Sequence, residues 1–262
     1  MNPLAVGIGA LLAAFGAYLA IVVRKKTEER VTELKFMKAA PLAEILSFWK
    51  SLVDQGLGDN YRDMVETNGT AVCDGQLRSP YGDIPCVYYE AMVTREYERE
   101  EVVRDKEGRT QRRVVRASEP VSSQKSPSPV YISDGGIRIG LDLDGADIDL
   151  KEGVDRFEPY ESSRNYSFFG VRFSSPSGSR TLGFRYKERI IPVGHPLYVV
   201  GEARASAGGL RIGLPSEGDK PFIVSVKSEE EVTRGEQGKA KMQLFLGIAL
   251  VVIGIVVALF VK

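Results

Sequence analysis

Two uncharged apolar runs stand near the two ends of the chain, at residues 3–23 and 244–261. The hydrocarbon core of a bilayer is about 30 Å thick, and a helix of about 20 apolar residues crosses it. A soluble helix of this length ordinarily carries a polar face, and neither run has one. The pattern therefore predicts two transmembrane helices with a polar region between them.

A helical period follows Pro41, where apolar residues recur every three or four positions up to Gly56. This spacing predicts an amphipathic helix, with Pro41 suited to its start and Gly56 to its end. The helix can lie on a membrane surface with Trp49 among the lipid headgroups, or it can pack on the polar domain. Packing on the domain is favoured because the helix has no basic polar face. Its apolar positions are Leu42, Ile45, Leu46, Trp49, Leu52 and Val53.

From Tyr61 onward the apolar period changes to two, which is typical of β-strands. Strands are predicted at residues 70–75 and 84–93, and further short strands with Gly and Asp turns follow in the second half of the chain. No helical period intervenes among them, which indicates a barrel or sandwich of short antiparallel strands. The predicted fold class is mainly β with one amphipathic helix, flanked by two transmembrane α-helices.

Residues 96–117 are predicted to form a long charged hairpin with its turn at residues 106–108. The first arm is mostly acidic and the second mostly basic, so opposite charges can face each other across the two strands. A polar hairpin of this kind projects into solvent and is a candidate surface for a protein partner. The candidate docking residues are Arg99, Glu100, Arg109, Arg112 and Arg113.

A last helix is predicted to start at Ser228, which forms a capping box with Glu231. Interruptions of this helix are expected at Gly235 and Gly238. The chain then divides into five segments. These are transmembrane helix 1 (1–23), a charged stalk with the amphipathic helix (24–57), the β domain (58–227), a juxtamembrane segment (228–243) and transmembrane helix 2 (244–262).

Charge and small residues suggest how the two apolar helices are placed. Basic residues lie on the central-domain side of both, at 24–26 and at Lys239 and Lys241, so the positive-inside tendency places the domain in the cytoplasm and both termini outside. Small residues at four-residue spacing let helices approach closely in lipid, on each other or on a second copy as a homo-oligomer. They are Gly9, Ala13, Gly16, Ala17 and Ala20 in the first run and Gly254 and Ala258 in the second.

The composition limits the possible chemistry. Basic and acidic residues balance at 35 each, which argues against a nucleic-acid partner. His195 stands between predicted strands without an evident partner, and the aspartates between Asp142 and Asp149 do not follow the order of a calcium loop. No nucleophile-elbow or phosphate-loop sequence occurs. We therefore expect no catalytic site, no cofactor, no metal site and no enzymatic activity. The alternative is an enzyme or small-ligand binder that uses His195 or the carboxylates between Asp142 and Asp149.

Cys73 and Cys86 are the only cysteines, and two predicted strands carry them. If the turn between these strands closes near residues 79–80, the two cysteines face each other across the strands. Such a pair forms a disulfide in an oxidising compartment or stays reduced in a cytoplasm. The orientation expected from the basic residues favours reduced thiols.

Several strings, taken in order, resemble the GIDE domain, also called the BAM ("beside a membrane") domain. This domain is the membrane-flanked, β-rich region of mitochondrial and chloroplast outer-envelope E3 ubiquitin ligases such as MULAN. The resemblance covers about residues 30–262 and includes the arrangement of span, domain and span. The strings are VCDGQLRSPYGDIPCVYYEAMV, DLKEGVDRFEPYES, RYKERIIPVGHPLYVVGEARA, GLRIGLP and PFIVSVKSEEE.

In those ligases a zinc-binding RING finger follows the second span. Such a finger requires about eight Cys and His ligands, and this chain, which ends at Lys262, has two Cys and one His. The resemblance therefore implies a RING-less member, whose partners are the lipid bilayer and an unidentified protein. The function it implies is a protein-interaction or membrane-organisation module. The alternative is a component of E3 ubiquitin-protein transferase activity.

Overall fold

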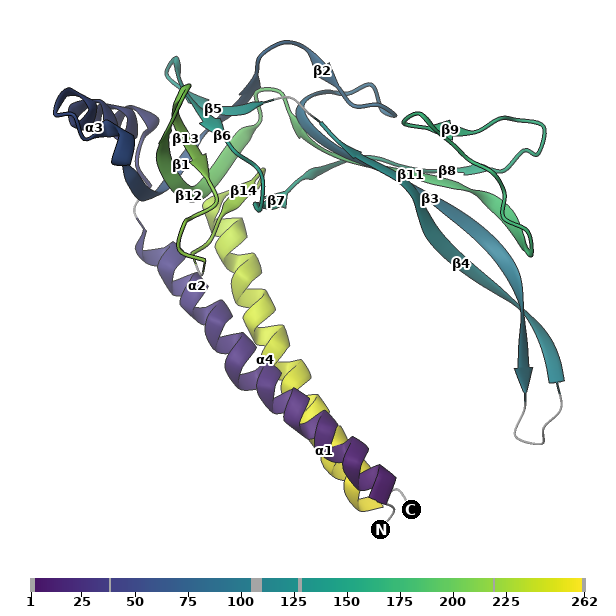
Figure 1. The fold of residues 1–262 in the computed structure, drawn as a ribbon. Coiled ribbons are helices and arrows are strands. Elements are labelled where there is room, and N and C mark those ends of the chain that lie inside the picture. The colour runs from purple at the N-terminus through teal and green to yellow at the C-terminus, as the bar shows by residue number, and fades with distance from the viewer. Residues whose placement is uncertain (1–2, 38, 105–109, 127–128, 219, 261–262) are drawn as a thin grey trace. The chain divides into compact units, whose positions relative to one another are not determined.

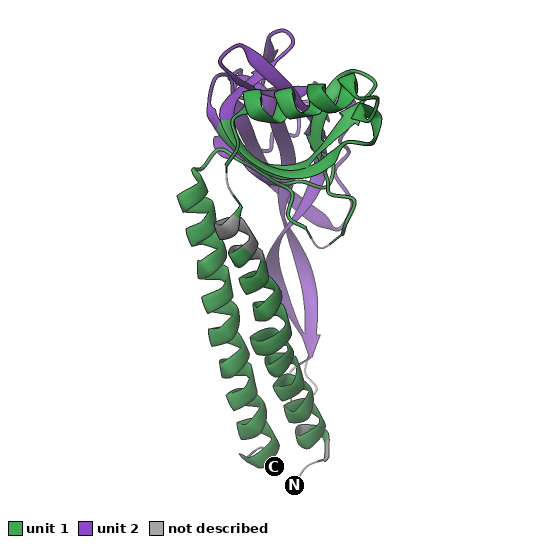
Figure 2. Ribbon diagram, turned by 90° about the vertical axis from the view of Figure 1, so that its left-hand side faces the viewer, with its two compact units in different colours: residues 1–68, 144–147, 197–262 green, residues 69–143, 148–196 purple. Residues whose placement is uncertain are grey.

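The computed structural model describes residues 3–37, 39–104, 110–126, 129–218 and 220–260. The chain divides into two compact units: unit 1 contains Met1–Asn68, Asp144–Asp147 and Leu197–Lys262, and unit 2 contains Gly69–Leu143 and Ile148–Pro196 (Figure 2). The predicted fold class is confirmed, because strands dominate and two apolar helices stand at the termini (Figure 1).

The helical elements are α1 (Pro3–Tyr18), a π-helical turn η1 (Leu19–Val23), α2 (Arg24–Phe36), α3 (Leu42–Asp54), a 3-10 turn η2 (Gly58–Asn60) and α4 (Glu229–Phe260). The strands are β1 (Arg62–Cys73), β2 (Leu77–Arg78), β3 (Pro85–Arg104), β4 (Thr110–Lys125), β5 (Val130–Asp134), β6 (Ile137–Leu141), β7 (Asp147–Asp149), β8 (Lys151–Pro159), β9 (Ser167–Phe168), β10 (Val171–Arg172), β11 (Ser179–Pro192), β12 (Pro196–Ser206), β13 (Gly209–Gly213) and β14 (Ile223–Ser225).

In unit 1, α1, η1 and α2 follow one another as a continuous helical stretch that lies beside α4 (Figures 1 and 2). Two stretches are long and apolar enough to cross a membrane, Val6–Glu29 and Glu229–Leu259. The predicted capping box is present, since the Glu231 N–H donates to Ser228 Oγ (3.4 Å) and the Ser228 N–H donates to Glu231 Oε2 (3.1 Å).

The prediction that the last helix is interrupted at Gly235 and Gly238 was wrong, because α4 is continuous through both residues. A glycine inside a helix costs about 1 kcal/mol relative to alanine. Two such costs are small for a 32-residue helix whose flank packs against α1 and α2. Tertiary packing therefore overrides the local preference of these two residues.

Four glycines bring α1 and α4 into backbone contact. A methyl group added to Gly16 would lie 2.6 Å from the carbonyl oxygen of Gly247, and one added to Gly247 would lie 2.7 Å from the carbonyl oxygen of Gly16. A methyl group added to Gly254 would likewise lie 2.5 Å from the carbonyl oxygen of Gly9. Only glycine permits this approach, so the small-residue faces pack on each other within one chain. The homo-oligomer through these faces stays a prediction.

The β strands of unit 1 include β12, which pairs antiparallel with β13 and with β14. The amphipathic helix α3 packs on this unit through Leu42 and Ile45, which are buried. The Trp49 indole N–H donates to the Gly58 carbonyl oxygen (3.3 Å), so this tryptophan is held by the chain itself. Val53, expected on the apolar face, is exposed.

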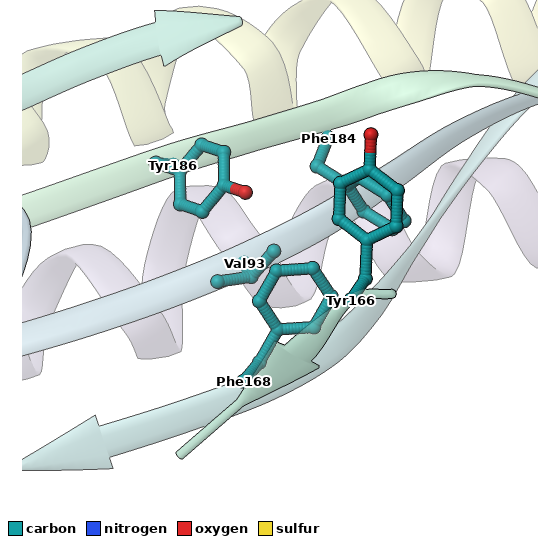
Figure 3. Packing of buried hydrophobic residues seen from close by; sticks show 5 residues of the cluster. All are labelled: Val93, Tyr166, Phe168, Phe184 and Tyr186. Carbon is teal, nitrogen blue, oxygen red and sulfur yellow. The ribbon is translucent and has the colours of Figure 1, made fainter. Parts of the chain in front are cut away.

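Unit 2 is built around an antiparallel sheet in the order β2, β3, β11, β8. β4 also pairs with β3, along residues 90–104, whereas β2 pairs with β3 at residues 85–86. On one face lies a cluster of Val93, Tyr166, Phe168, Phe184 and Tyr186 (Figure 3). The Phe184 ring centroid lies 4.7 Å from that of Tyr166 and 4.9 Å from that of Phe168, a spacing that favours tilted aromatic packing. This cluster holds the small β9–β10 hairpin on the sheet.

We expect that Gly16→Leu separates α1 from α4. Overpacking a close contact costs about 1–3 kcal/mol, and here the obstruction is backbone that cannot rotate away. Thr27 Oγ1 donates to Gln243 Oε1 (3.0 Å), so these two residues report the contact between the first helical stretch and α4. The test is disulfide formation between Thr27→Cys and Gln243→Cys in a chain whose two native cysteines are replaced.

The matched control is Gly7→Leu, because no atom lies within 4 Å of the position a methyl group on Gly7 would take. Gly7→Leu should leave the rate of cross-linking unchanged, and Gly16→Leu should lower it. Equal rates in the two variants would show that the helix pair does not depend on the glycine contact.

Candidate interaction surface

The charged hairpin extends past the sheet as a two-stranded ribbon. β3 and β4 pair from Glu90↔Lys125 to Arg104↔Thr110, whereas β11 pairs with β3 only as far as Arg99↔Ser179. Residues 100–104 and 110–114 therefore have only each other as paired neighbours (Figure 1). The predicted pairing of the two arms is present. The predicted turn and Arg109 lie outside the described residues.

Opposite charges pair along the ribbon. The Glu98 carboxylate accepts hydrogen bonds from Arg116 of β4 (3.1 Å) and Arg180 of β11 (2.9 Å), and these bonds lower the pKa of Glu98. Nearer the tip, Arg112 Nη1 lies 3.8 Å from Glu100 Oε2. Exposed pairs of this kind contribute little to stability.

Three valines are exposed between these charges. Val102 is 64%, Val103 47% and Val114 60% exposed. The register sets Val102 opposite Arg112 and Val114 opposite Glu100, so Val102 and Val114 share one face of the ribbon and Val103 lies on the other. β-branched residues are favoured in strands, but strand formation alone does not require them to be exposed at this density. The ribbon thus presents apolar side chains on both faces, each next to arginine.

One edge of the ribbon is open. Within the part of the chain that the structure describes, β4 pairs with β3 alone, and its 16 residues have no strand on their other side. An open edge presents a row of backbone N–H and C=O groups to which another strand can be added. The surface therefore combines backbone hydrogen-bonding groups, arginines and valines.

Arg95 fixes the root of the ribbon. Its side chain is 1% exposed; Nε donates to Thr181 Oγ1 (2.9 Å), Nη1 to Glu119 Oε1 (2.8 Å) and Nη2 to Ser179 Oγ (2.6 Å). Its guanidinium also lies 4.3 Å from the centroid of the Tyr97 ring. One buried charge thus joins β3, β4 and β11. Sequence analysis missed Arg95, although its place two residues after buried Val93 on the same face was a usable signal.

The two cysteines are close but do not face each other across paired strands. The register sets Leu77 opposite Cys86, which corrects the predicted pairing of Cys73 with Cys86. β1, which ends at Cys73, pairs with β5 instead. Both cysteines are free, and Cys73 Sγ lies 4.0 Å from the Cys86 carbonyl oxygen. Burial, with the Glu188 charge second, raises the pKa of Cys86 to about 11, which makes it a poor nucleophile.

The other residues weighed for chemistry are not assembled into a site. His195 Nδ1 lies 2.9 Å from the Pro196 carbonyl oxygen, and its backbone carbonyl accepts from the Ala71 N–H. Asp147 and Asp149 belong to the short strand β7. No group of three or more His, Cys, Asp or Glu side chains suited to a metal ion occurs among the described residues.

Comparison with known families identifies the chain. The model of the GIDE family, described as E3 ubiquitin ligase, matches residues 100–259, which include the ribbon, β5 to β14 and most of α4. The chain belongs to the GIDE family. The resemblance noted in the sequence is therefore confirmed.

A curated relative is similar over part of its length. The E3 ubiquitin-protein ligase SPL1 of Arabidopsis thaliana is 28% identical over 143 residues, which cover 54% of this chain and 41% of that protein. The chain thus spans less than half of the relative it matches. No solved structure matches significantly.

We expect that Glu119→Ala destabilises unit 2 by about 3 kcal/mol. Removing one partner of a buried ion pair typically costs 3–5 kcal/mol because the other charge stays buried, and the low end applies since Glu119 is half-buried. The control is Glu101→Ala, which removes the partner of exposed Arg99 and should cost at most about 1 kcal/mol. Urea unfolding followed by near-ultraviolet circular dichroism of the aromatic cluster measures both. Equal losses would show that Arg95 does not anchor the ribbon.

Proposed function

We propose that this GIDE-family protein is a membrane-anchored interaction module that binds a protein partner on the ribbon of β3 and β4. The observation that carries the proposal is the extension of these strands past the sheet with one edge open. The two apolar helices anchor the chain in a bilayer. The docking residues are those predicted from the sequence: Arg99, Glu100, Arg109, Arg112 and Arg113.

The chemistry of β4 favours an extended, acidic partner segment. Basic residues outnumber acidic ones on this strand by four to one. Its single carboxylate, on Glu119, is already bound by Arg95. A strand added along β4 would exchange backbone hydrogen bonds with it, and its carboxylates would meet the arginines. Valine side chains on the two faces would contact apolar residues of the same segment.

The orientation that suits this function keeps the β domain in the cytoplasm. Basic residues stand next to both apolar helices on the domain side, at 24–26 and at Lys239 and Lys241, and Arg24 to Lys26 directly follow η1. Short basic segments of this kind are retained on the cytoplasmic side during insertion. In this arrangement the reduced state of Cys73 and Cys86 also fits the compartment.

A photo-reactive amino acid in place of Val103 should cross-link to the partner in native membranes. The same amino acid in place of Val171, which is also an exposed valine but lies on β10, is the control and should give no adduct. Reversing two charges with Arg112→Glu and Arg113→Glu should lower the adduct yield at least tenfold, about 1.4 kcal/mol in binding free energy. Mass spectrometry of the adduct then identifies the bound segment.

Arg172→Glu, which reverses an exposed arginine on β10, controls for a charge reversal away from the ribbon and should leave the yield at Val103 unchanged. An adduct of equal strength at Val171, or an adduct at Val103 that survives both charge reversals, would contradict docking on the ribbon. A partner segment without acidic residues would contradict the proposed charge complementarity.

A second candidate function follows from the family. The family description and the Arabidopsis relative both name E3 ubiquitin ligase activity. Within these 262 residues two Cys and one His cannot supply the eight ligands of a RING finger. In this function these 262 residues would serve as the partner-binding component of a ligase whose RING lies outside them.

Reconstituted ubiquitination separates the two functions. The full chain in nanodiscs, mixed with ubiquitin, activating enzyme and a panel of conjugating enzymes, should give no ubiquitin transfer above a reaction without the chain. Transfer that requires the chain alone would contradict the binding-module proposal. Transfer that appears only when a RING protein is added, and that depends on Arg112 and Arg113, would support the ligase-component function.

A further inference from the structure

A buried carboxyl group in unit 1 lacks the partners that buried charges normally have. Glu66 of β1 is 1% exposed, and neither of its carboxylate oxygens has a hydrogen-bond partner. The hydroxyl of Tyr198 on β12 is also buried without a partner. Burying a polar group without a hydrogen bond is costly, and burying a charge without a partner costs more. The docking ribbon makes no use of either residue.

The polar groups that face Glu66 come from β12 and α4. Tyr198 of β12 lies close enough that its hydroxyl opposes the rise in the pKa of Glu66 that burial causes, although the two groups form no hydrogen bond in this structure. Glu229, in the first turn of α4, contributes a second negative charge. The Tyr198 ring also packs with Val232 of α4 in an apolar cluster with Val200, Ile223, Met37 and Met64. No cation among the described residues forms an ion pair with Glu66.

These surroundings favour the neutral carboxylic acid. Burial is the largest cause that raises the pKa of Glu66, and the Glu229 charge adds to it. A carboxyl whose pKa is higher in the folded than in the unfolded state stabilises the fold while it is protonated. That stabilisation is complete below the ordinary pKa of a glutamic acid and is lost as pH rises through the raised value.

Glu66 also lies where both apolar helices join the β strands. Its backbone carbonyl accepts from the Ala40 N–H (2.8 Å), and Thr67 Oγ1 donates to the Ala40 carbonyl oxygen (2.8 Å). The segment after α2 is therefore tied to the backbone of residues 66–67. The side chain of the same residue faces the start of α4, which runs without a break toward its apolar end.

We propose that Glu66 is a proton-binding site that controls how firmly the first turns of α4 are attached to β1 and β12. While the carboxyl is neutral, it is tolerated among the apolar side chains, and Val232 stays packed on Tyr198. When the carboxyl ionises, Glu229 repels it, and hydration of the carboxylate becomes more favourable than burial. The first turns of α4 then separate from the strands, and the change reaches the apolar helix.

Hydrogen exchange of the full chain in nanodiscs tests the proposal. Amide protection of residues 229–236, corrected for intrinsic exchange, should fall at least threefold in the wild type between pH 5 and pH 8.5. Glu66→Gln keeps the shape of the side chain without its charge, so the amide protection of residues 229–236 in this variant should not change with pH. Its melting temperature should exceed that of the wild type by about 2–4 °C at pH 8.5 and equal it at pH 5.

Two further variants make the result specific. Glu66→Met replaces the charged side chain with an apolar one of similar size and should abolish the pH response in the same way. It keeps the test decisive if the glutamine variant does not fold. Glu202→Gln is the control on β12: its carboxylate accepts from the Ser216 N–H (3.0 Å), and Ser216 and Arg62 help to lower its pKa, so it stays ionised across this range. A wild-type profile that is flat, or one that Glu66→Gln and Glu66→Met leave unchanged, would overturn the proposal.

Discussion

The architecture of unit 1 depends on backbone contact between its first and last helices. Gly16 against Gly247 and Gly9 against Gly254 bring the two backbones closer than any side chain would allow. In lipid the hydrophobic effect does not drive helices together, so dispersion contacts over a close, matched surface supply the attraction. The two ends of the chain are thereby joined, and every strand of the β domain lies in sequence between two elements that are fixed to each other.

Much of this organisation could be predicted because it depends on local patterns in the sequence. Apolar runs without charge predict the two terminal helices, and Ser228 with Glu231 predicts the start of α4. The acidic and basic arms of the hairpin predict their own pairing, since opposite charges can then face each other across the two strands. In each case the interacting residues are near in sequence or belong to one periodic element.

The rest depends on contacts between distant residues. The pairing of Cys86 with Leu77 follows from a tight loop in which the Glu188 carboxylate accepts from the Tyr81 N–H (2.5 Å) and the Gly82 N–H (2.9 Å), more than 100 residues earlier in the chain. No local sequence pattern predicts these two hydrogen bonds. Arg95 and Glu66 were missed for a related reason, because a charged residue in a strand is ordinarily assigned to the solvent face.

Arg95 and Glu66 show two outcomes of burying an ionisable group. Arg95 has a carboxylate, two hydroxyls and an aromatic ring around it, so the cost of desolvating its charge is offset. Glu66 is buried without a hydrogen-bond partner and lies near a second carboxylate, so its charge is opposed and depends on pH. The first arrangement suits a rigid docking ribbon, and the second suits an attachment that responds to its surroundings. In the function that we propose, a binding module anchored through α4 would use both, because partner recognition requires fixed geometry and regulation requires two states of similar free energy.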